Sequence, residues 1–438
     1  MSGPLDDPVR HAIEPANSLK GEVVLPGDKS ISHRTAILAA LAQGRSVIRN
    51  YSASEDCTRT LDCLEQMDVE ILRKATSVEI LGRGGSGLRE PRNVLYAGNS
   101  GTSMRLLAGV VAGLPFRSRL LGDDSLNSRP MARIIAPLKQ MGGRIQARQD
   151  RFPPLDVSGR CLQGIEYELP VASAQVKSCI LLAGLLARGE TTVVEPTSTR
   201  NHTELLIPAF GGRIRKEGTR ISVEGGQDLE ATEMEVPGDI SAASFFLVAA
   251  SLIPNSQIKL RRVGLNPTRD ALLRLLIQHG GRIEISNPDV SGGEPVGDLC
   301  VSYSPRLMEG FPTRIGGHQI PLLIDEIPVL AILGSRLKSG FEVTGASELR
   351  AKESDRIRAI VHNLRSLGIE TEERKDGFQI PPGQTFRGGE VRTWGDHRIA
   401  MAFAIAGLIS EQPVVLDDAR CCGVSFPGFL EQLASVNS

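Results

Sequence analysis

The tetrapeptide Gly-Gly-Arg-Ile occurs three times in this chain of 438 residues, at equal intervals. Its copies begin at Gly142, Gly211 and Gly280, so each follows the previous one by 69 residues. Every copy comes after an amphipathic stretch typical of a helix and before a β-rich stretch, as expected where a helix ends and a strand begins. Regular spacing of this length predicts a repeat architecture, in which each unit has the same supersecondary structure.

A second series of segments, rich in alanine and leucine, follows the same period. Because their apolar residues lie on several helical faces, we expect these helices to be buried rather than half-solvated. The β-branched stretches after most of them predict strands. The helix bodies are expected at residues 36–41, 106–111, 180–186, 245–250, 330–333 and 400–408. Together the two series indicate six units, each of the form β-α-β-α-β-β.

The two halves of the chain also resemble each other. The Val-Leu-Pro-Gly-Asp segment that begins at Val24 returns, as Val-Pro-Gly-Asp, at Val236. Three units per half predict an α/β (α+β) fold with two similar domains, each of three repeats around buried parallel helices. We expect one domain to comprise residues 1–26 and 238–438 and the other residues 27–237, with the active site in the cleft between them. The Pro-Gly dipeptides at both crossings indicate hinges, and the strand expected at residues 23–25 is predicted to complete the sixth unit.

The overall composition is ordinary for a globular protein. Hydrophobic residues make up 41% and charged residues 23%, and the net charge is -1, so neither nucleic acid nor a membrane surface is expected as a partner. The seven cysteines show no paired metal-ligand spacing, which favours reduced, mostly buried thiols in a cytosolic protein. The N-terminal residues lack the apolar core of a signal peptide, and no apolar run is long enough to span a bilayer. We therefore predict a cytoplasmic protein without a metal or other cofactor.

One helix start carries an unusual cluster of cations and hydroxyls. Lys29, Ser30 and Arg34 lie in the first turn of a helix or in the loop before it, and this helix is expected to end before Gly44. The N–H groups and partial positive charge of a helix N-terminus favour an anion there, most naturally a phosphate. The alternative is a solvated, well-capped helix start that binds nothing.

The other buried helices also begin with polar clusters. Their starts are expected at Asn99-Ser100-Gly101-Thr102, Ser173-Ala174-Gln175, Pro237-Gly238-Asp239, Asp325-Glu326 and Gly395-Asp396. If the helices of each domain run parallel, these starts converge, and nearby cations would favour a doubly anionic ligand. The cations are Arg129, Arg200, Lys352, Arg356 and Arg398.

Each of these polar residues also has a purely structural interpretation. Lys177 can be an ordinary pairing partner one turn into its helix, Asp396 a simple N-cap and His397 a hydrogen-bonded core histidine. The run from Lys352 to Arg356 can be a solvated charged segment. Because the chain has neither metal-type pairs of histidines or cysteines nor a nucleophile elbow, the clusters favour group transfer by proton movement.

Five motifs are long enough to be specific. They are residues 25–34 (Leu-Pro-Gly-Asp-Lys-Ser-Ile-Ser-His-Arg), 98–102 (Gly-Asn-Ser-Gly-Thr), 127–131 (Asn-Ser-Arg-Pro-Met), 352–356 (Lys-Glu-Ser-Asp-Arg) and 395–401 (Gly-Asp-His-Arg-Ile-Ala-Met). These motifs resemble those of the EPSP synthase (3-phosphoshikimate 1-carboxyvinyltransferase) family of enolpyruvyl transferases, and the resemblance runs from about Leu19 to Phe429. It implies two domains of three β-α-β-α-β-β units each, an inside-out α/β barrel, in agreement with the repeats counted above.

The resemblance implies transfer of the enolpyruvyl group of phosphoenolpyruvate to the 5-hydroxyl of shikimate 3-phosphate with release of phosphate, a step toward chorismate and the aromatic amino acids. The residues implied for shikimate 3-phosphate are Lys29, Ser30, Arg34, Ser173, Ala174, Gln175, Arg200, Asp325 and Lys352. Those implied for phosphoenolpyruvate are Lys29, Gly101, Arg129, Gln175, Arg356 and Arg398. The implied catalytic residues are Lys29, Asp325 and Glu353, with Asp325 transferring a proton at the 5-hydroxyl and Glu353 at the methylene carbon. No metal or cofactor is implied, and we expect a monomer with small-molecule partners only.

Several positions differ from one branch of the family and are similar to its second, more divergent bacterial branch. Ala174 stands where the first branch has the second of two serines, so it can offer a phosphate only its backbone. His202 replaces a tyrosine, and Val424 replaces a lysine. The second branch often tolerates the inhibitor glyphosate, whereas Gly101 keeps the small residue associated with sensitivity, so the response to this inhibitor stays open.

Two other functions stay open at this point. UDP-N-acetylglucosamine enolpyruvyl transferase shares the fold and the donor, but it typically carries a reactive cysteine on a mobile loop, and the corresponding residues 121–131 contain none. It also opens its first helix with Lys-Asn rather than with Lys-Ser and a later arginine. A non-catalytic anion-binding repeat protein would need the cations but not Asp325 together with Glu353.

Overall fold

The computed structural model describes residues 9–437 and divides into two compact units. Unit 1 comprises Met1–Pro26, Gly238–Asp289 and Val296–Ser438, and unit 2 comprises Gly27–Pro237 and Val290–Pro295. The chain therefore passes between the units at four points. Two of them are the Pro-Gly dipeptides, and the other two flank the tip of a hairpin formed by β17 (Arg282–Ser291) and β18 (Glu294–Ser302). Nothing in the sequence indicated that this tip belongs to unit 2.

Unit 2 contains three sheets that share one strand pattern. In each, two neighbouring strands are parallel and the remaining strands pair antiparallel. The first sheet has the order β14 (Leu229–Glu230), β3 (Ala42–Arg49), β5 (Ser77–Arg83), β4 (Glu70–Arg73), and β15 (Glu233–Glu235) also pairs with β3. The second has the order β6 (Leu95–Tyr96), β7 (Arg117–Leu121), β9 (Phe152–Ser158), β8 (Arg144–Arg148), and the third β10 (Glu166–Glu168), β11 (Glu190–Val194), β13 (Arg220–Glu224), β12 (Ile214–Glu217).

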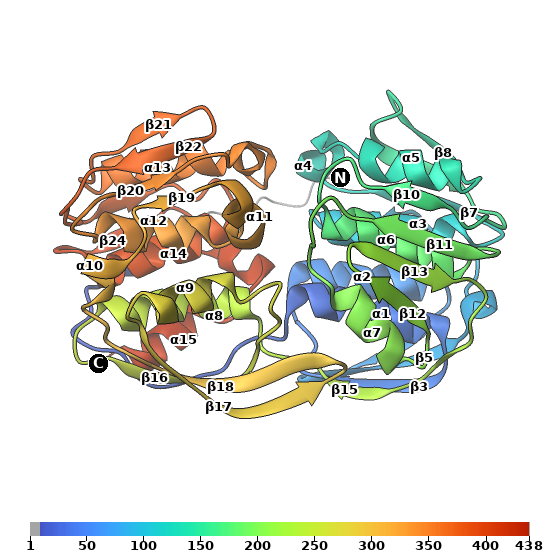
Figure 1. Cartoon of the computed structure of the whole chain (residues 1–438), viewed down its shortest axis with the longest axis horizontal. Helices are drawn as coiled ribbons and strands as arrows, with labels where there is room; N and C mark the ends of the chain where they lie inside the picture. The colour runs from blue at the N-terminus through green and yellow to red at the C-terminus, as the bar shows by residue number, and fades with distance from the viewer. Residues whose placement is uncertain (1–8, 438) are drawn as a thin grey trace. The chain divides into compact units, whose positions relative to one another are not determined.

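The first sheet of unit 2 is completed by the far end of the same segment of chain. β14 and β15 pair in parallel with β3, although they follow it by nearly the whole of unit 2. Figure 1 shows β15 beside β3. The last strands of unit 2 therefore complete the sheet of its first repeat, so the three repeats form a closed arrangement.

Unit 1 repeats the same pattern. Its first sheet has the order β17, β18, β16 (Gln257–Gly264), β2 (Lys20–Val23). The second has the order β19 (Arg314–Ile315), β20 (Phe341–Val343), β22 (Gly377–Ile380), β21 (Glu372–Arg374). The third has the order β1 (His11–Ile13), β24 (Val414–Leu416), β23 (Gly389–Val391). The prediction for the N-terminal strand is wrong in part. The strand before the first helix ends at Val23 and pairs with β16 of the fourth unit, whereas β1 completes the sixth sheet. Val24, expected inside a buried strand, is 67% exposed.

Six helices are buried along nearly their whole length, at the positions predicted. They are α1 (Lys29–Leu41), α3 (Gly101–Ala112) and α6 (Ala174–Leu185) in unit 2, and α8 (Ile240–Leu252), α12 (Ile327–Ser335) and α14 (His397–Leu408) in unit 1. Amphipathic helices accompany them, namely α2 (Glu55–Gln66), α5 (Ala132–Gln140), α9 (Ala271–Gln278), α13 (Arg356–Ser366) and α15 (Phe429–Val436), together with the mostly buried α7 (His202–Ala209). Short helices are α4 (Asp124–Ser128), α10 (Leu307–Gly310) and α11 (Ile320–Leu323). The predicted fold class, two sets of three α/β repeats around buried helices, is confirmed.

The first helix begins as predicted but ends earlier. Asp28 caps it by accepting a hydrogen bond from the N–H of Ile31 at 2.9 Å, which places Lys29 at its first position. The helix ends at Leu41, and Gly44 lies inside β3 with a φ of 104°. Gly44 is therefore not the helix cap that we expected from the sequence.

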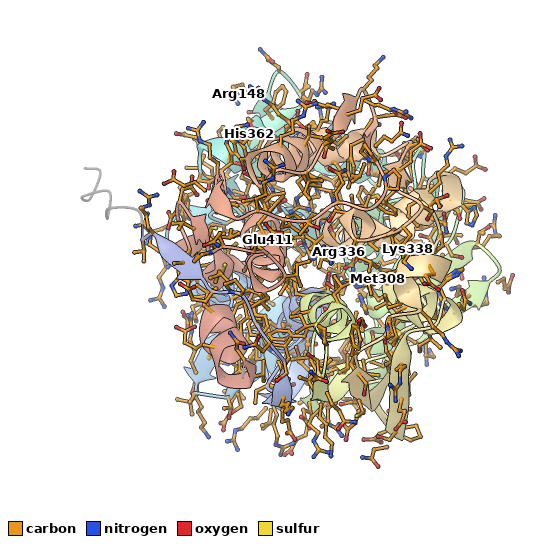
Figure 2. The ribbon with its side chains drawn as sticks, turned by 90° about the vertical axis from the view of Figure 1, so that its left-hand side faces the viewer. Arg148, Met308, Arg336, Lys338, His362 and Glu411 are labelled. Carbon is orange, nitrogen blue, oxygen red and sulfur yellow. The ribbon has the colours of Figure 1, made fainter. Side chains whose placement is uncertain are left out.

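The outside of unit 1 is charged, while its core is apolar. Figure 2 looks onto this unit, with Arg336, Lys338 and Glu411 labelled on its surface. Lys338 Nζ lies 2.7 Å from Glu309 Oε1, and both side chains are more than half exposed. Exposed pairs of this kind contribute little stability, so the buried helices supply most of it. No helix among residues 9–437 is long and apolar enough to cross a bilayer.

The cysteines agree with the expectation of reduced, mostly buried thiols. None of the seven takes part in a disulfide, and all lie in the described part of the chain. Burial raises the pKa of Cys57, Cys63 and Cys179 to about 12, so these thiols are poor nucleophiles at neutral pH. Cys161 is exposed.

Two buried helices of unit 2 approach each other closely at a glycine. A Cβ atom on Gly109 of α3 would lie 2.3 Å from the carbonyl oxygen of Cys179 on α6. Because that atom belongs to the backbone of a helix, it cannot move aside without shifting the helix.

We therefore expect Gly109→Ala to lower the free energy of unfolding by ~1–3 kcal/mol, because the helices must separate to admit the methyl group. The matched control is Gly423→Ala, where a Cβ would meet nothing within 4 Å, and it should change stability by less than ~0.5 kcal/mol. Equilibrium unfolding in urea measures both. A wild-type unfolding midpoint for Gly109→Ala would contradict the close approach.

Candidate active site

In unit 2, the first turns of α1, α6 and α7 are joined through Arg34. Arg34 lies one turn into α1 and is 3% exposed. Its Nε donates to Thr203 Oγ1, its Nη2 to Ser178 Oγ and its Nη1 to the carbonyl oxygen of Ser30, each at 2.8 Å. Burial lowers the pKa of Arg34 to about 10, and the carboxylate of Glu204 opposes this shift, so the guanidinium stays charged at neutral pH. The starts of α1 and α6 therefore lie together, as the sequence predicted.

The start of α3 joins this group through an amide. Arg105 Nη1 donates to Gln175 Oε1 at 2.7 Å, and Gln175 Nε2 donates to Thr102 Oγ1 at 2.9 Å. Both hydrogen bonds connect the first turns of α3 and α6. A Cβ on Gly101 would lie 2.6 Å from Arg105 Nη1, so the missing side chain leaves room for this cation.

Lys29 pairs with Asp56, which the sequence did not single out, and Arg129 pairs with Asn99 from the predicted start of α3. Lys29 Nζ lies 2.9 Å from Asp56 Oδ2 on α2, and the two side chains are 19% and 13% exposed. Arg129 follows α4 and donates through Nη2 to Asn99 Oδ1. Asn99 Nδ2 in turn donates to Asp123 Oδ2 at 2.7 Å, which turns the amide oxygen toward Arg129.

The remaining predicted residues of unit 2 lie at the starts of α6 and α7. Ser173 caps α6 by accepting a hydrogen bond from the N–H of Val176 at 3.4 Å, and Ala174 is the first residue of this helix. Arg200 is half-buried and precedes α7, the helix that also supplies Thr203. These residues share one end of the buried helices with Arg34 and Gln175.

Lys177 has the structural role that was the alternative for it. It is fully buried, with Nζ 3.0 Å from Glu195 Oε2 and 2.6 Å from Glu204 Oε1. His202, the residue that replaces a tyrosine of the other branch, is also buried, and its Nδ1 lies 2.7 Å from Glu294 Oε1 at the hairpin tip. Both side chains support the loop and the first turn of α7.

In unit 1, the carboxylate of Asp325 faces three cations just before α12. Its Oδ1 lies 3.6 Å from Lys352 Nζ and 3.7 Å from Arg356 Nη1, and its Oδ2 lies 3.8 Å from Arg269 Nη1. Its side chain is 14% exposed. The three cations stabilise the negative charge of Asp325, yet each pair is longer than a hydrogen bond.

Arg356 is the centre of a second group in unit 1. Its Nε lies 2.8 Å from Asp396 Oδ2 and its Nη2 lies 2.6 Å from Glu353 Oε2. Its buried Nη1 has no hydrogen-bond partner among the described residues. Burial would lower the pKa of Arg356, but Asp396 and Glu353 raise it above its usual value. Burial would likewise raise the pKa of Asp396, and Arg356 instead holds it below the usual range.

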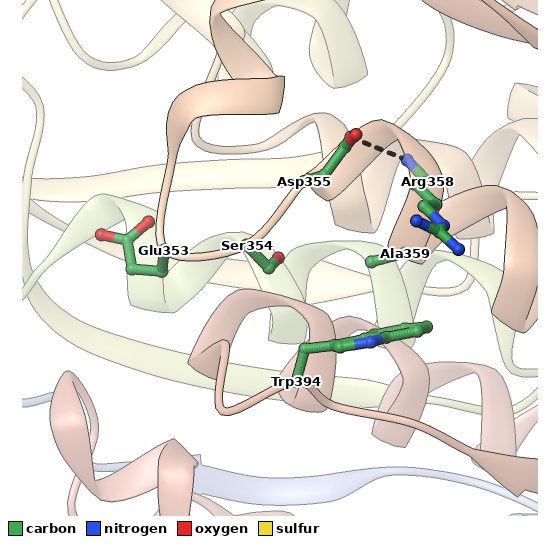
Figure 3. Close-up of a pocket in the computed structure, with 6 residues that line it drawn as sticks. All are labelled: Glu353, Ser354, Asp355, Arg358, Ala359 and Trp394. Atoms are coloured by element: carbon green, nitrogen blue, oxygen red, sulfur yellow. Dashed lines mark hydrogen bonds between the residues drawn. The ribbon is translucent and has the colours of Figure 1, made fainter. Parts of the chain in front are cut away.

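Glu353 also borders a pocket of about 360 Å³. The pocket is lined by Glu353, Ser354, Asp355, Arg358, Ala359 and Trp394. Figure 3 shows the indole ring of Trp394 below Ser354 and Ala359, with Glu353 to one side. The segment before α13 is therefore not a fully solvated charged run, since its side chains shape both this pocket and the contacts of Arg356.

Arg398, at the start of α14, connects the three buried helices of unit 1. Its Nη1 donates to Ser241 Oγ of α8 at 2.8 Å and to the carbonyl oxygen of Asp325 at 2.9 Å. Ser241 also donates to the buried carboxylate of Glu326. The predicted convergence of the helix starts therefore holds within unit 1 as well.

Sequence reasoning missed Arg269, although a signal for it was present. Arg269 is 4% exposed in its side chain and lies 3.7 Å from Asp239 Oδ1 as well as near Asp325. It precedes α9 and follows Arg200, which precedes α7, by the 69 residues that separate the Gly-Gly-Arg-Ile copies. The repeat alone could therefore have predicted it.

Taken separately, each unit offers a charged cluster at one end of its three buried helices. The cluster of unit 2 is mainly cationic and can bind an anion through guanidinium, ammonium and helix N–H groups. The cluster of unit 1 combines cations with carboxylates that can accept or donate protons. Among residues 9–437, no three His, Cys, Asp or Glu side chains lie together as they would around a metal ion.

Comparison with known proteins finds close relatives over almost the whole chain. The family model described as EPSP synthase (3-phosphoshikimate 1-carboxyvinyltransferase) matches residues 13–433. The 3-phosphoshikimate 1-carboxyvinyltransferase of Solibacter usitatus is 47% identical over 97% of this chain and 99% of its own length. That of Bacillus subtilis is 46% identical over 95% of this chain and 97% of its own. The solved structure of EPSP synthase from Acinetobacter baumannii matches with a TM-score of 0.85 and 41% identity, covering 98% of each chain.

A buried histidine at the start of α1 should make the folding stability depend on pH. His33 is fully buried, and its Nδ1 lies 2.7 Å from Thr60 Oγ1. Burial lowers the pKa of His33 from 6.5 to about 3, and Asp56 only partly opposes this. The unfolded chain therefore binds a proton below pH 6.5 that the folded protein does not bind until about pH 3, and folding stability falls over this range as the pH falls.

We expect His33→Gln to reduce the loss of stability between pH 6 and pH 4 by up to ~1.4 kcal/mol per pH unit. Urea unfolding of the variant and of the wild type across this range gives the two slopes. Above pH 7.5 the slopes should coincide, because His33 is then neutral in both states, and this region is the internal control. Identical slopes below pH 6 would mean that His33 takes up its proton in the folded state.

Proposed function

Because this chain belongs to the EPSP synthase family, we propose that it transfers the enolpyruvyl group of phosphoenolpyruvate to the 5-hydroxyl of shikimate 3-phosphate. The products are 5-enolpyruvylshikimate 3-phosphate and phosphate, on the route to chorismate and the aromatic amino acids. The observation that carries this conclusion is the family match over residues 13–433. Both substrates are anionic, which suits the cations gathered at the helix starts of each unit.

Shikimate 3-phosphate is assigned to residues of both units. We propose that Arg34 and Lys29 contact its phosphate or carboxylate, since their cations lie at the N-terminal end of α1. The full proposed set is Lys29, Ser30, Arg34, Ser173, Ala174, Gln175, Arg200, Asp325 and Lys352. Ala174 contributes its backbone N–H, which at the first position of α6 has no acceptor within the helix.

Phosphoenolpyruvate is likewise assigned to residues of both units. The full proposed set is Lys29, Gly101, Arg129, Gln175, Arg356 and Arg398. The buried Nη1 of Arg356, which has no hydrogen-bond partner among the described residues, supports its role because a buried donor calls for an acceptor. We also propose that the active site lies in the cleft between two domains, one formed by residues 27–237 and the other by the rest of the chain. This proposal is supported by the two substrate-binding sets, because each draws on residues of both units.

The proton transfers are assigned to two carboxylates, with Lys29 as the third catalytic residue. The new bond joins the 5-hydroxyl oxygen to C2 of phosphoenolpyruvate, and the bond from C2 to the phosphate oxygen breaks. Asp325 accepts the hydroxyl proton, and Glu353 delivers a proton to the methylene carbon, which must lose it again because the product keeps a CH2 group. Arg356 supports this assignment for Glu353, since it holds the carboxylate at 2.6 Å.

The acceptor distinguishes this function from its alternatives. We expect phosphate to be released from phosphoenolpyruvate when shikimate 3-phosphate is added, and not when UDP-N-acetylglucosamine is added. A phosphate-release assay with each acceptor measures this directly. Release with the sugar nucleotide would indicate the sister reaction, and no release with either acceptor would indicate a non-catalytic anion-binding protein.

The high pKa of the buried thiols agrees with a reaction that needs no cysteine. A monomeric state, a cytoplasmic location and the lack of nucleic-acid partners remain predictions.

We expect Glu353→Gln to lower kcat by ~10²–10⁴-fold with KM for both substrates nearly unchanged, because it removes a proton donor that acts in the transition state. Asp325→Asn should lower kcat and also raise KM for shikimate 3-phosphate, because it removes a hydrogen-bond acceptor for the substrate as well. Steady-state kinetics with each substrate varied in turn separates the two patterns.

The matched control for Glu353→Gln is Glu373→Gln. Glu373 also pairs with an arginine of unit 1, Arg350, at 3.0 Å, and its side chain is 34% exposed against 27% for Glu353. It lies away from the starts of the buried helices, so its loss should leave kcat within about twofold. A tenfold loss of kcat raises the activation free energy by only ~1.4 kcal/mol. If Glu353→Gln kept more than about a tenth of the wild-type kcat, the proposed role of Glu353 would be wrong.

A further inference from the structure

Thr203, a residue that no motif singled out, lies directly behind Arg34. It is the second residue of α7 and is 1% exposed. Its Oγ1 lies 2.8 Å from Arg34 Nε and 2.7 Å from Ser178 Oγ, and Arg34 Nη2 lies 2.8 Å from that same Ser178 oxygen. The three side chains therefore form a closed triangle that joins α1, α6 and α7.

The direction of every hydrogen bond in this triangle is determined. Ser178 donates its only hydroxyl proton to the carbonyl oxygen of Ala174 at 2.7 Å. Thr203 must therefore donate to Ser178, because one of the two hydroxyls has to supply the proton between them. The oxygen of Thr203 is then left to accept from Arg34 Nε, and the oxygen of Ser178 accepts from both Thr203 and Arg34 Nη2. Both hydroxyl protons are used, so the hydrogen bonds of the triangle have a single arrangement.

This arrangement fixes the plane of the Arg34 guanidinium. The group has five N–H donors, and three of them are taken by Thr203, Ser178 and the Ser30 carbonyl. One N–H remains on each terminal nitrogen. One N–H on each terminal nitrogen is the pair with which a guanidinium can bind a phosphate or carboxylate in bidentate fashion. The same triangle ends on the carbonyl of Ala174, whose N–H belongs to the proposed phosphate site.

We propose that Thr203 and Ser178 are positioning residues for shikimate 3-phosphate, which act by orienting the Arg34 guanidinium toward the anion; this inference rests on the proposed function. Thr203 does not contact the substrate. Its hydroxyl accepts the hydrogen bond of Arg34 Nε. Without this acceptor the guanidinium can turn about the last bonds of the Arg34 side chain, and its two remaining N–H groups lose their fixed direction toward the anion. Because the loss affects binding before and during the reaction alike, it should appear in KM and not in kcat.

The test is a kinetic comparison of Thr203→Val, which keeps the shape of the side chain but removes the hydroxyl, with Thr203→Ser, which restores it. We expect Thr203→Val to raise KM for shikimate 3-phosphate about tenfold, or ~1.4 kcal/mol, with kcat and KM for phosphoenolpyruvate within about twofold of wild type. Thr203→Ser should return KM to near the wild-type value. Equal KM values for Thr203→Val and wild type, or a Thr203→Ser variant as impaired as Thr203→Val, would overturn the proposal.

A matched control is Thr192→Val. Thr192 Oγ1 lies 2.8 Å from Ser222 Oγ in another buried hydroxyl pair of unit 2, between strands rather than at the helix starts. It should leave KM for shikimate 3-phosphate unchanged, and an equal rise in this control would contradict the proposal. If Thr203→Val does not fold, as judged by its thermal unfolding, Ser178→Ala tests the same triangle from α6 and should raise KM in the same way.

Two further comparisons show whether the effect passes through Arg34. In an Arg34→Lys background, where Nε is absent, adding Thr203→Val should cause no further rise in KM, whereas an additive rise would contradict the positioning role. The wild-type enzyme tests the premise separately. If it does not release phosphate from phosphoenolpyruvate with shikimate 3-phosphate, the proposed function is wrong; if it does and Thr203→Val behaves like wild type, only the positioning role is wrong.

Discussion

Burial of six helices along almost their whole length determines where this protein can bind a polar ligand. In α8, for example, every residue from Ile240 to Leu252 is buried. A helix surrounded by apolar side chains can offer polar groups only at its ends, and its first N–H groups have no acceptor within the helix. Asp28, Ser100 and Ser173 each cap one such start in unit 2 by accepting one of these N–H groups. The other N–H groups at each start have no acceptor within the helix, so they can bind an anion, in keeping with the cations and small residues that lie there.

The charged side chains at these helix starts are held in place by successive hydrogen bonds and ion pairs, each side chain fixing the next. In unit 1, Asp396 is fully buried and fixes Arg356, which in turn holds Glu353. In unit 2, Thr203 and Ser178 fix Arg34 in the same manner. A buried charge that lost its partner would cost several kcal/mol, so these contacts keep their geometry in the absence of a ligand. The last side chain of each series, Glu353 or Arg34, is therefore held in place by more deeply placed hydrogen-bond partners, Arg356 and Asp396 or Thr203 and Ser178.

Sequence reasoning predicted what depends on local pattern and missed what depends on pairing across the fold. The six buried helices, and the Ser or Asp caps that begin five of them, follow from runs of small apolar residues and the polar residue before each run, which are local features. The partner of Lys29, Asp56, lies on a different helix, so no local pattern reveals it. Arg269 is an intermediate case, because comparison of equivalent repeat positions would have identified it beside Arg200. Lys177 agrees with the structural interpretation that the sequence allowed for it, an ordinary pairing partner one turn into its helix, because its ammonium pairs with two buried glutamates.

The crossings between the two units show most clearly why the sequence was not enough. The Pro-Gly dipeptides indicated hinges, but a Cβ on Gly27 would lie 1.8 Å from the carbonyl oxygen of Asn50, so close packing alone requires this glycine. The two crossing segments are also joined to each other. The N–H of Asp28 donates to the Pro237 carbonyl at 2.8 Å, and the N–H of Asp239 donates to the Pro26 carbonyl at 2.9 Å. Asp28 and Pro237 both belong to unit 2, and Asp239 and Pro26 both belong to unit 1, so each unit joins its own ends of the two crossing segments. The residues beside each Pro-Gly dipeptide, which look unconstrained in the sequence, are thus held within each unit by a hydrogen bond to a residue about 210 positions away, a contact that the repeated fold creates.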